Sequence, residues 1–426
     1  MCPRPLSFST RAVHAGAAPD PATGARTFPI YQSNGFVFDD LEHGADIFAL
    51  KRAGFAYARG SNPNCAALER RVADLEGGKS AIAVGSGQAA WFITLLTLLG
   101  SGDRYVGASR MFGGSLGLMK RMDQRLNIGV QWAEPEAASI AAAITSQTKA
   151  IIIESIINPT GEIVDLPAIA AVAKAHNLPL IVDNTLASPA LLRPIEHGAD
   201  IVLHSASKFL AGHGHVIGGI IVDAGRFDWK NDTRFPLISS PWPDYDDIVL
   251  PEAFPETAFT AAARLTGMRE YGPGLAPILA QMIATATETL PLRMEKHCTN
   301  ALAVARYLAS HPAVAVVSHP LLGSEEQRKL AARLMPDGVG SIFTATLKGG
   351  ENAAKQVLTS VKLFSHLVNI GESRSLLAHP ATTTHRTLNE ATREGLGITP
   401  GTLRISIGLE DEADLIADLD QALRGL

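Results

Sequence analysis

The residues of this chain best suited to chemistry gather around Lys208. The segment 204–208 reads His-Ser-Ala-Ser-Lys, follows an apolar run, and precedes the glycine-rich segment 212–215. A lysine just beyond the carboxyl end of a parallel strand lies where open α/β sheets bind their ligands. Ser205 and Ser207 could donate hydrogen bonds to a phosphate group. The alternative is a surface lysine in a serine-rich turn.

A second candidate is Asp183, which ends the apolar run 180–182. An acidic residue at the end of a buried strand could bind a metal ion, pair with the protonated ring nitrogen of a cofactor, or cap the following turn. Asp183 precedes Lys208 by about one strand–helix–strand passage, so we expect the two residues at neighbouring strand ends.

The segment 85–90, Gly-Ser-Gly-Gln-Ala-Ala, connects a predicted strand to a predicted helix. Backbone amides at the start of a helix bind phosphate. The same letters match the dinucleotide pattern GxGxxG/A, so a Rossmann-type oxidoreductase is the alternative. That class needs an acidic residue about 20 residues further on, at the end of the next strand. The predicted strand 104–108 is followed by Ser-Arg, which favours the phosphate interpretation.

Two further residues suit the binding of a small ligand. Phe112 follows a predicted strand and precedes two glycines, so it could stack on a flat ring, although a core phenylalanine fits the same pattern. Arg404 alternates with apolar neighbours in a strand-like segment and could bind a carboxylate through two hydrogen bonds. An exposed strand arginine is the alternative. The 13 histidines form no HExxH motif and no Cys/His ligand spacing, so we expect no metal.

Short apolar runs and helical patterns alternate from about residue 64 onward. Strands are expected at 80–85, 104–108, 129–133, 150–155, 179–183, 201–204 and 219–222, and helices at 66–75, 88–99 and 166–176 among others. This alternation, with strands that are almost continuously apolar, predicts an α/β fold with a mainly parallel sheet that is covered on both faces.

The chain is expected to divide into an N-terminal arm (1–63), a cofactor-binding domain (64–288) and a smaller C-terminal α/β domain (289–426). One long helical pattern runs from about 275 to 310, and strand-like pieces follow at 341–347 and 404–408. The proline-rich segment 225–257 interrupts the alternation. A loop of this length is typical of a functional segment, an interface or disorder.

Composition narrows the classes of function. With 426 residues and 46% hydrophobic residues the chain can bury a large core. A net charge of −5 without a long basic tract disfavours binding to nucleic acid. The three cysteines are far apart and predict no disulfide framework, which fits a cytoplasmic protein. Residues 1–16 contain no apolar core of signal-peptide length. The apolar stretch 89–99 is too short to span a membrane.

Taken in order, these motifs resemble the cysteine/methionine-metabolism branch of the fold-type I pyridoxal-phosphate (PLP) enzymes. The matching order is Gly85-Ser86-Gly87, Phe112-Gly113-Gly114, Asn158-Pro159, Asp183, Ser205-x-Ser207-Lys208 and Leu403-Arg404-Ile405-Ser406. The resemblance extends from Tyr31 to Glu410. Within this branch the segments 31–51, 227–254 and 289–295 are similar to the O-acetylhomoserine sulfhydrylases. The resemblance implies a large domain with a mainly parallel seven-stranded sheet and a smaller C-terminal domain.

The resemblance also implies a role for individual residues. Lys208 would hold PLP as a Schiff base and transfer protons, Asp183 would pair with the ring nitrogen, and Phe112 would stack on the ring. The phosphate would be bound by Gly87, Gln88, Ser205 and Ser207, with Tyr57 and Arg59 of a neighbouring subunit. The substrate carboxylate would be held by Arg404, Asn158 and Ser375. A site shared between subunits implies at least a dimer, and the family is usually a homotetramer.

The expected reaction is γ-substitution on O-acetyl-L-homoserine by sulfide or a thiol, giving homocysteine or methionine and acetate. The alternatives are a cystathionine γ-synthase or γ-lyase, a non-sulfur nucleophile, an inactive binding protein, and the oxidoreductase mentioned above. The chain departs from the family at Phe112 (usually Tyr), Asn64 (Thr), Leu186 (Phe) and His215 (Thr), which bears on the nucleophile and the acyl group. Gly114 stands where γ-lyases commonly have cysteine, which disfavours lyase action.

Overall fold

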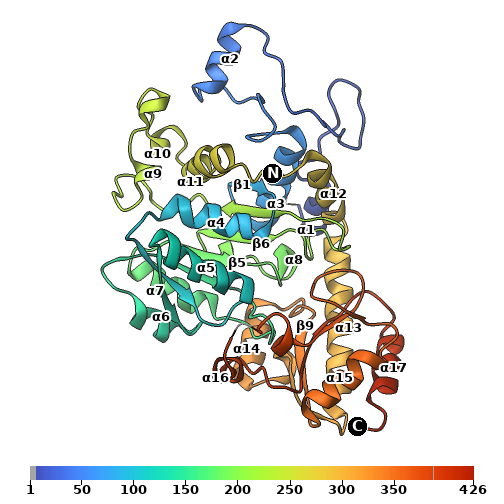
Figure 1. The fold of residues 1–426 in the computed structure, drawn as a ribbon. Helices are drawn as coiled ribbons and strands as arrows, with labels where there is room; N and C mark the ends of the chain where they lie inside the picture. The colour runs from blue at the N-terminus through green and yellow to red at the C-terminus, as the bar shows by residue number, and fades with distance from the viewer. Residues whose placement is uncertain (1–5, 387) are drawn as a thin grey trace, which may run out of the picture.

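The computed structural model describes residues 6–386 and 388–426, and in this part of the chain it contains two β-sheets with helices packed around them (Figure 1). The larger sheet has the strand order β1-β7-β6-β5-β4-β2-β3. Its strands are β1 (Ser80–Val84), β2 (Arg104–Ala108), β3 (Gly129–Ala133), β4 (Thr148–Glu154), β5 (Leu180–Asp183), β6 (Ile201–Ser205) and β7 (Gly219–Asp223). All seven predicted strands are confirmed, with ends that differ by about one or two residues.

Four strand pairs of the larger sheet are parallel, and β7 is antiparallel to both of its neighbours, β1 and β6. The connecting helices are α3 (Pro63–Glu76), α4 (Gly87–Leu98), α5 (Gly113–Leu126), α6 (Ala137–Ala143), α7 (Leu166–Ala175), α8 (Ser188–Leu191) and η1 (Pro194–His197). Helix α3 packs against β1 and β7, and α4 packs against β6 and β7. The carboxyl ends of the parallel strands therefore share one edge of the sheet.

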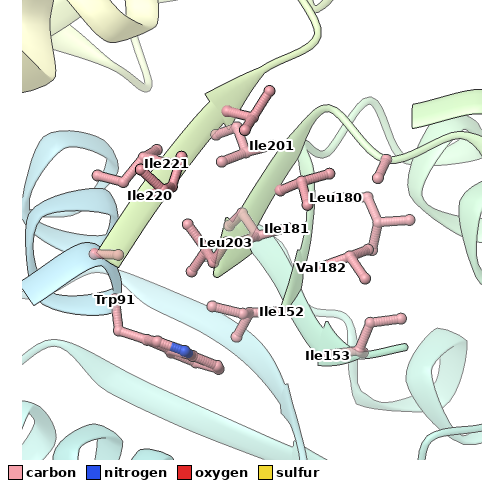
Figure 2. Close-up of a cluster of buried hydrophobic side chains, with 14 of the residues drawn as sticks. Trp91, Ile152, Ile153, Leu180, Ile181, Val182, Ile201, Leu203, Ile220 and Ile221 are labelled. Atoms are coloured by element: carbon pink, nitrogen blue, oxygen red, sulfur yellow. The ribbon is translucent and has the colours of Figure 1, made fainter. Parts of the chain in front are cut away.

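The core of this sheet explains its sequence pattern. Figure 2 shows the aliphatic side chains of β4, β5, β6 and β7 gathered together, with Trp91 of α4 beside them. Residues 150–153, 180–182, 201–203 and 220–222 are fully buried. A strand that is covered on both faces needs apolar residues at successive positions, which is why these runs do not alternate with polar residues.

The segment predicted as a long loop folds onto the core through short helices. These are α9 (Pro236–Ser239), η2 (Pro243–Tyr245) and α10 (Leu250–Ala253), and they precede α11 (Ala258–Ala262) and the π-helix η3 (Ala263–Glu270). Trp229 and Phe235 are buried, and the Trp229 ring stacks on Phe259 with centroids 5.9 Å apart. Aromatic burial of this kind anchors a segment that has little regular structure.

The prediction of one helix from about 275 to 310 is wrong, because the structure has two helices there. Helix α12 (Pro277–Thr287) ends before α13 (Leu290–Ser310) begins, and Pro291 lies in the first turn of α13. Proline lacks an amide hydrogen, so it is tolerated in a first turn and not inside a continuous helix. We propose that the boundary between the two larger domains lies at this break, near residue 288.

The second sheet has the strand order β10-β11-β12-β9-β8. Its strands are β8 (Val314–Ser318), β9 (Ile342–Leu347), β10 (Ser365–His366), β11 (Leu376–Ala378) and β12 (Thr402–Ser406). The accompanying helices are η4 (Pro320–Leu322), α14 (Glu325–Leu334), α15 (Gly350–Ser360), η5 (Pro380–Thr382), α16 (Glu390–Gly395) and α17 (Glu412–Leu423). A separate apolar cluster lies between this sheet, α13, α15 and α17.

The N-terminal segment carries two helices, α1 (Phe8–His14) and α2 (Leu41–Phe48). Helix α1 lies on α3, where Arg11 forms an ion pair with Asp74 at 2.8 Å. Helix α2 projects away from the two sheets at the top of Figure 1. None of the helices in residues 6–386 and 388–426 is long and apolar enough to cross a membrane.

Candidate active site

A cavity of about 430 Å³ lies at the edge of the larger sheet where the parallel strands end. The segments that follow β1, β2, β4, β5 and β6 contribute Gly87, Gln88, Phe112, Asn158, Asp183, Ser205, Ser207 and Lys208 to its wall. Arg404 of β12 and residues 368–370 reach it from the second sheet. The structure thus brings together nine of the predicted site residues by placing strand ends side by side.

The turn after β1 is built to present backbone amides. The Ser86 hydroxyl accepts a hydrogen bond from the Ala89 amide at 3.1 Å and so caps α4. Helical geometry leaves the first amides of α4, including Gly87 and Gln88, without partners in their own helix. A Cβ atom on Gly87 would lie 2.7 Å from Cβ of Ser205, so this close approach requires glycine. The amides and Ser205 therefore face one small space suited to an anion.

Ser207 is less open to a ligand than its neighbour. Its hydroxyl donates to the Gly218 carbonyl at 3.2 Å and accepts from the Gly218 amide at 3.0 Å. A hydroxyl has a single proton, so Ser207 must release the Gly218 carbonyl before it can donate to a phosphate.

Asp183 has both carboxylate oxygens occupied by donors. Oδ2 accepts from Nε1 of Trp91 at 2.7 Å, and Oδ1 accepts from the Thr185 amide at 2.9 Å. Two donors directed at one carboxylate fix its orientation. In the paired strands Asp183 stands next to Glu154, which also lines the cavity.

Lys208 lies within a polar network on the side of the second sheet. Its Nζ donates to Oδ1 of Asn369, and Nδ2 of Asn369 donates to Glu372 at 2.8 Å. Burial and, to a lesser extent, the charge of Arg404 lower the pKa of Lys208 to about 8, against the opposing effect of Glu372. About a tenth of the amine is therefore neutral at pH 7, in the form that a nucleophile or a base needs.

Arg404 is buried, and its Nη2 donates to the Asn369 carbonyl at 3.1 Å. Burial lowers the pKa of Arg404 to about 10, and the guanidinium still stays charged at neutral pH. A buried guanidinium with spare donors needs an anionic partner, which an α-carboxylate would supply.

Three predicted site residues do not line this cavity. Tyr57 and Arg59 are exposed on the N-terminal arm, where the guanidinium lies 5.6 Å from the ring centroid. Ser375 is buried, and its hydroxyl donates to Glu410 and accepts from the Gly408 amide, each at 2.8 Å. The roles of Tyr57 and Arg59 toward a neighbouring subunit, and of Ser375 toward a carboxylate, stay predictions.

Four residues at or next to the site were missed by sequence reasoning: Trp91, Glu154, Asn369 and Glu372. Glu154 carries a signal that could have found it, because it ends the apolar run of β4 as Asp183 ends that of β5. Trp91 belongs to a helix that is apolar on all sides, and Asn369 and Glu372 lie in a loop without periodicity.

The residues of the cavity fit PLP. The amides at the start of α4 and Ser205 suit its phosphate, Asp183 suits its ring nitrogen, and Lys208 suits its aldehyde carbon. Oδ1 of Asn158 is buried in the cavity wall without a hydrogen-bond partner in the described chain. A buried polar atom of this kind indicates that a polar ligand belongs beside it.

Comparison with known proteins gives the same result over the whole chain. Residues 9–424 match the family described as Cys/Met metabolism PLP-dependent enzyme. A homocysteine synthase from Schizosaccharomyces pombe is 42% identical, with 98% of each chain covered. An O-acetyl-L-homoserine sulfhydrylase from Leptospira meyeri is 40% identical, covering 100% of this chain and 98% of the relative.

A solved structure is similar throughout. The crystal structure of a putative O-acetylhomoserine (thiol)-lyase from Campylobacter jejuni has a TM-score of 0.95 and 35% identity, and the match covers 99% of this chain and 100% of that one. It contains N'-pyridoxyl-lysine-5'-monophosphate. This rules out the Rossmann-type oxidoreductase and confirms the fold-type I architecture. The chain is a PLP-dependent enzyme, and it belongs to the Cys/Met metabolism family.

Proposed function

We propose that the chain catalyses γ-substitution on O-acetyl-L-homoserine, with sulfide or a thiol as nucleophile, and releases homocysteine or methionine and acetate. The observation that carries this proposal is the presence of Lys208 and Arg404 in one cavity beside Asp183. An amino-acid substrate needs a cation for its carboxylate and a neutral amine to remove a proton from Cα. The names of the relatives supply the acetylated homoserine and the sulfur nucleophile.

Each side chain has a distinct task in this reaction. Arg404 binds the α-carboxylate and so fixes where Cα lies. Lys208 holds PLP covalently until the substrate amine replaces it, and its amine then moves a proton from Cα. When bound, PLP supplies an electron sink for the negative charge left on the substrate. Asp183 keeps the ring nitrogen protonated, and the hydrogen bond from Trp91 keeps Asp183 in place.

The cavity also has the apolar surface that such a reaction needs. Phe112 lies on one side, and Leu186, Val216 and Ile217 are further lining residues. Apolar walls exclude water from the proton transfers and from the γ-carbon after acetate leaves. They leave room for sulfide or a small thiol.

Product analysis tests the proposal. The holoenzyme is incubated with O-acetyl-L-homoserine, with and without sulfide, and homocysteine, acetate and 2-oxobutyrate are quantified. We expect homocysteine and acetate in equal amounts only when sulfide is present. Release of 2-oxobutyrate without sulfide would indicate a γ-lyase, and absence of both products would rule out this substrate.

Two variants connect the result to the site. Lys208→Ala should abolish turnover, whereas Lys174→Ala, which changes an exposed lysine on α7, should leave it unchanged. Full turnover by Lys208→Ala would contradict the role given to this amine.

We further propose that the enzyme is a cytoplasmic homotetramer in which Tyr57 and Arg59 complete the phosphate site of a neighbouring subunit. The exposed apolar side chains on the arm support this, since Val37 is 95% and Leu41 88% exposed. Mixing inactive Lys208→Ala with Arg59→Ala subunits tests the sharing. A mixed dimer regains one intact site, so activity should return on mixing, and no recovery would contradict a shared site.

A further inference from the structure

We infer that Glu154 is a positioning residue, which holds two segments of the PLP cavity wall, at Phe112 and at Asn158, through the two oxygens of one carboxyl group. This inference rests on the proposed function and concerns how the residues of the cavity wall are held in position. Glu154 is buried at the end of β4 and lines the cavity.

The first contact fixes the ring-stacking residue. Oε1 of Glu154 accepts a hydrogen bond from the Phe112 amide at 2.9 Å. Phe112 is the residue immediately before α5, and its side chain makes no capping hydrogen bond. The backbone of Phe112 is therefore held across the sheet edge by a side chain of β4.

The second contact fixes the turn after β4 itself. Oε2 of Glu154 lies 3.4 Å from the Asn158 amide, which donates to it. Asn158 lines the cavity, and its buried Oδ1 has no hydrogen-bond partner in the described chain. One carboxyl group thus couples the chain segment after β2 to the segment after β4.

Packing around Phe112 makes this backbone contact important. A Cβ atom on Gly114 would lie 2.4 Å from Cε1 of Phe112, so the ring sits directly over the glycine. The position of the ring depends on where its backbone is held, because Gly114 beneath the ring has no side chain that could prevent a shift. Loss of the Glu154 contact leaves the partly buried Phe112 amide without its acceptor and allows the ring to shift.

Glutamine is the substitution at Glu154 that tests these two amide contacts most directly. Burial and the adjacent charge of Asp183 raise the pKa of Glu154 well above its ordinary value. Glutamine keeps the shape of this side chain, but it has one acceptor oxygen in place of two. Glu154→Gln removes one amide contact with little change in side-chain volume.

The experiment measures PLP affinity of the apoenzyme, the visible circular dichroism of bound PLP, and kcat and KM with O-acetyl-L-homoserine. We expect Glu154→Gln to weaken PLP binding and to lower kcat by about 10-fold each, with little change in KM. The circular dichroism of the cofactor should change, because its ring is held differently. Glu136→Gln, at an exposed glutamate before α6, is the matched control and should behave like wild type.

A double-variant cycle distinguishes positioning from plain structural support. If Glu154 acts through Phe112, the effects of Glu154→Gln and Phe112→Leu on PLP affinity should be smaller together than their sum. Wild-type PLP affinity and dichroism in Glu154→Gln would overturn the inference, and so would additive effects with a lower melting temperature of the apoenzyme. Failure of the proposed function is recognised separately, because wild type would then bind PLP without forming homocysteine.

Discussion

The indole nitrogen of Trp91 donates a hydrogen bond to Oδ2 of Asp183 at 2.7 Å. This contact connects α4, whose first turn is proposed to bind the phosphate, with the carboxylate that is proposed to pair with the cofactor ring. A carboxylate with a fixed donor keeps one orientation, so the proposed site would have both ends of PLP positioned by the same helix.

Trp91→Phe should therefore weaken the enzyme without unfolding it. Phenylalanine keeps most of the buried apolar surface but removes the donor to Asp183, so we expect kcat/KM to fall about 10-fold. Steady-state kinetics with O-acetyl-L-homoserine and sulfide measure the effect. Trp132→Phe, at a partly exposed tryptophan of β3, is the control. Equal activity of the two variants would contradict the role given to Trp91.

The attachment of PLP to Lys208 should depend on pH. Burial and the charge of Arg404 lower the pKa of this lysine to about 8, and only the neutral amine attacks an aldehyde. The rate at which the apoenzyme binds PLP covalently should rise with pH, reach half its maximum near pH 8 and level off about one pH unit higher. Rapid-mixing absorbance measurements follow this rate.

Arg404→Gln should move that pH dependence upward. Removing the nearby positive charge lets the pKa of Lys208 return toward its ordinary value, so the plateau should begin at a higher pH. The assay contains no amino-acid substrate, so loss of carboxylate binding does not interfere. Arg121→Gln, at an exposed position on α5, should keep the wild-type profile. An unchanged profile in Arg404→Gln would show that the two charges do not interact.

Gly114→Ala should displace the ring of Phe112. The added Cβ would lie 2.4 Å from Cε1 of Phe112 and 3.0 Å from Nε2 of Gln88, which is closer than such atoms pack. Overpacking of this kind costs about 1–3 kcal/mol, so we expect PLP to bind about 10-fold more weakly. Fluorescence titration of the apoenzyme measures the affinity.

The same helix provides the control for this substitution. Gly117→Ala also changes a glycine of α5, and its Cβ would meet no atom within 4 Å. It should leave PLP binding unchanged, since alanine is a good helix former. In a Phe112→Leu background the cost of Gly114→Ala should shrink, and a full cost there would mean that the clash lies elsewhere.

Acid should destabilise the fold through His297. This buried histidine donates from Nδ1 to the Ile407 carbonyl at 2.7 Å, and burial together with Arg293 lowers its pKa to about 4. Between pH 6.5 and 4 the unfolded chain binds a proton that the folded chain does not, so stability falls as pH falls through this range. The contribution is about 3 kcal/mol at most.

Urea unfolding at several pH values tests this. The free energy of unfolding of His297→Gln should fall less steeply between pH 6.5 and 4 than that of wild type. His176→Gln, at an exposed histidine after α7, should follow the wild-type curve. A wild-type slope in His297→Gln would assign the acid sensitivity to other groups.

The sequence predicts the strand ends of the site better than its surroundings. Asp183 and the segment leading to Lys208 each follow a buried apolar run, and parallel strands bring such ends to one edge. Trp91 could not be singled out, because every side of α4 is apolar and no pattern marks the side that faces Asp183.

Tertiary packing decides the parts that local patterns cannot show. Asn369 reaches Lys208 only because the second sheet docks beside the first, and no periodicity marks its loop. The resemblance gave Ser375 a place at the substrate, while its hydroxyl in this structure pairs with Glu410. The break between α12 and α13 depended on Pro291, which the apolar periodicity on both sides concealed.

The antiparallel strand β7 also has a consequence for biosynthesis. β1 is complete at Val84, but the strand hydrogen-bonded to it begins at Gly219, after five other strands have left the ribosome. Pairing between such distant segments is slow, and an edge that waits for its neighbour is open to aggregation. The Ser86 turn, packed against Gly219, is thus finished late, after β7 has docked.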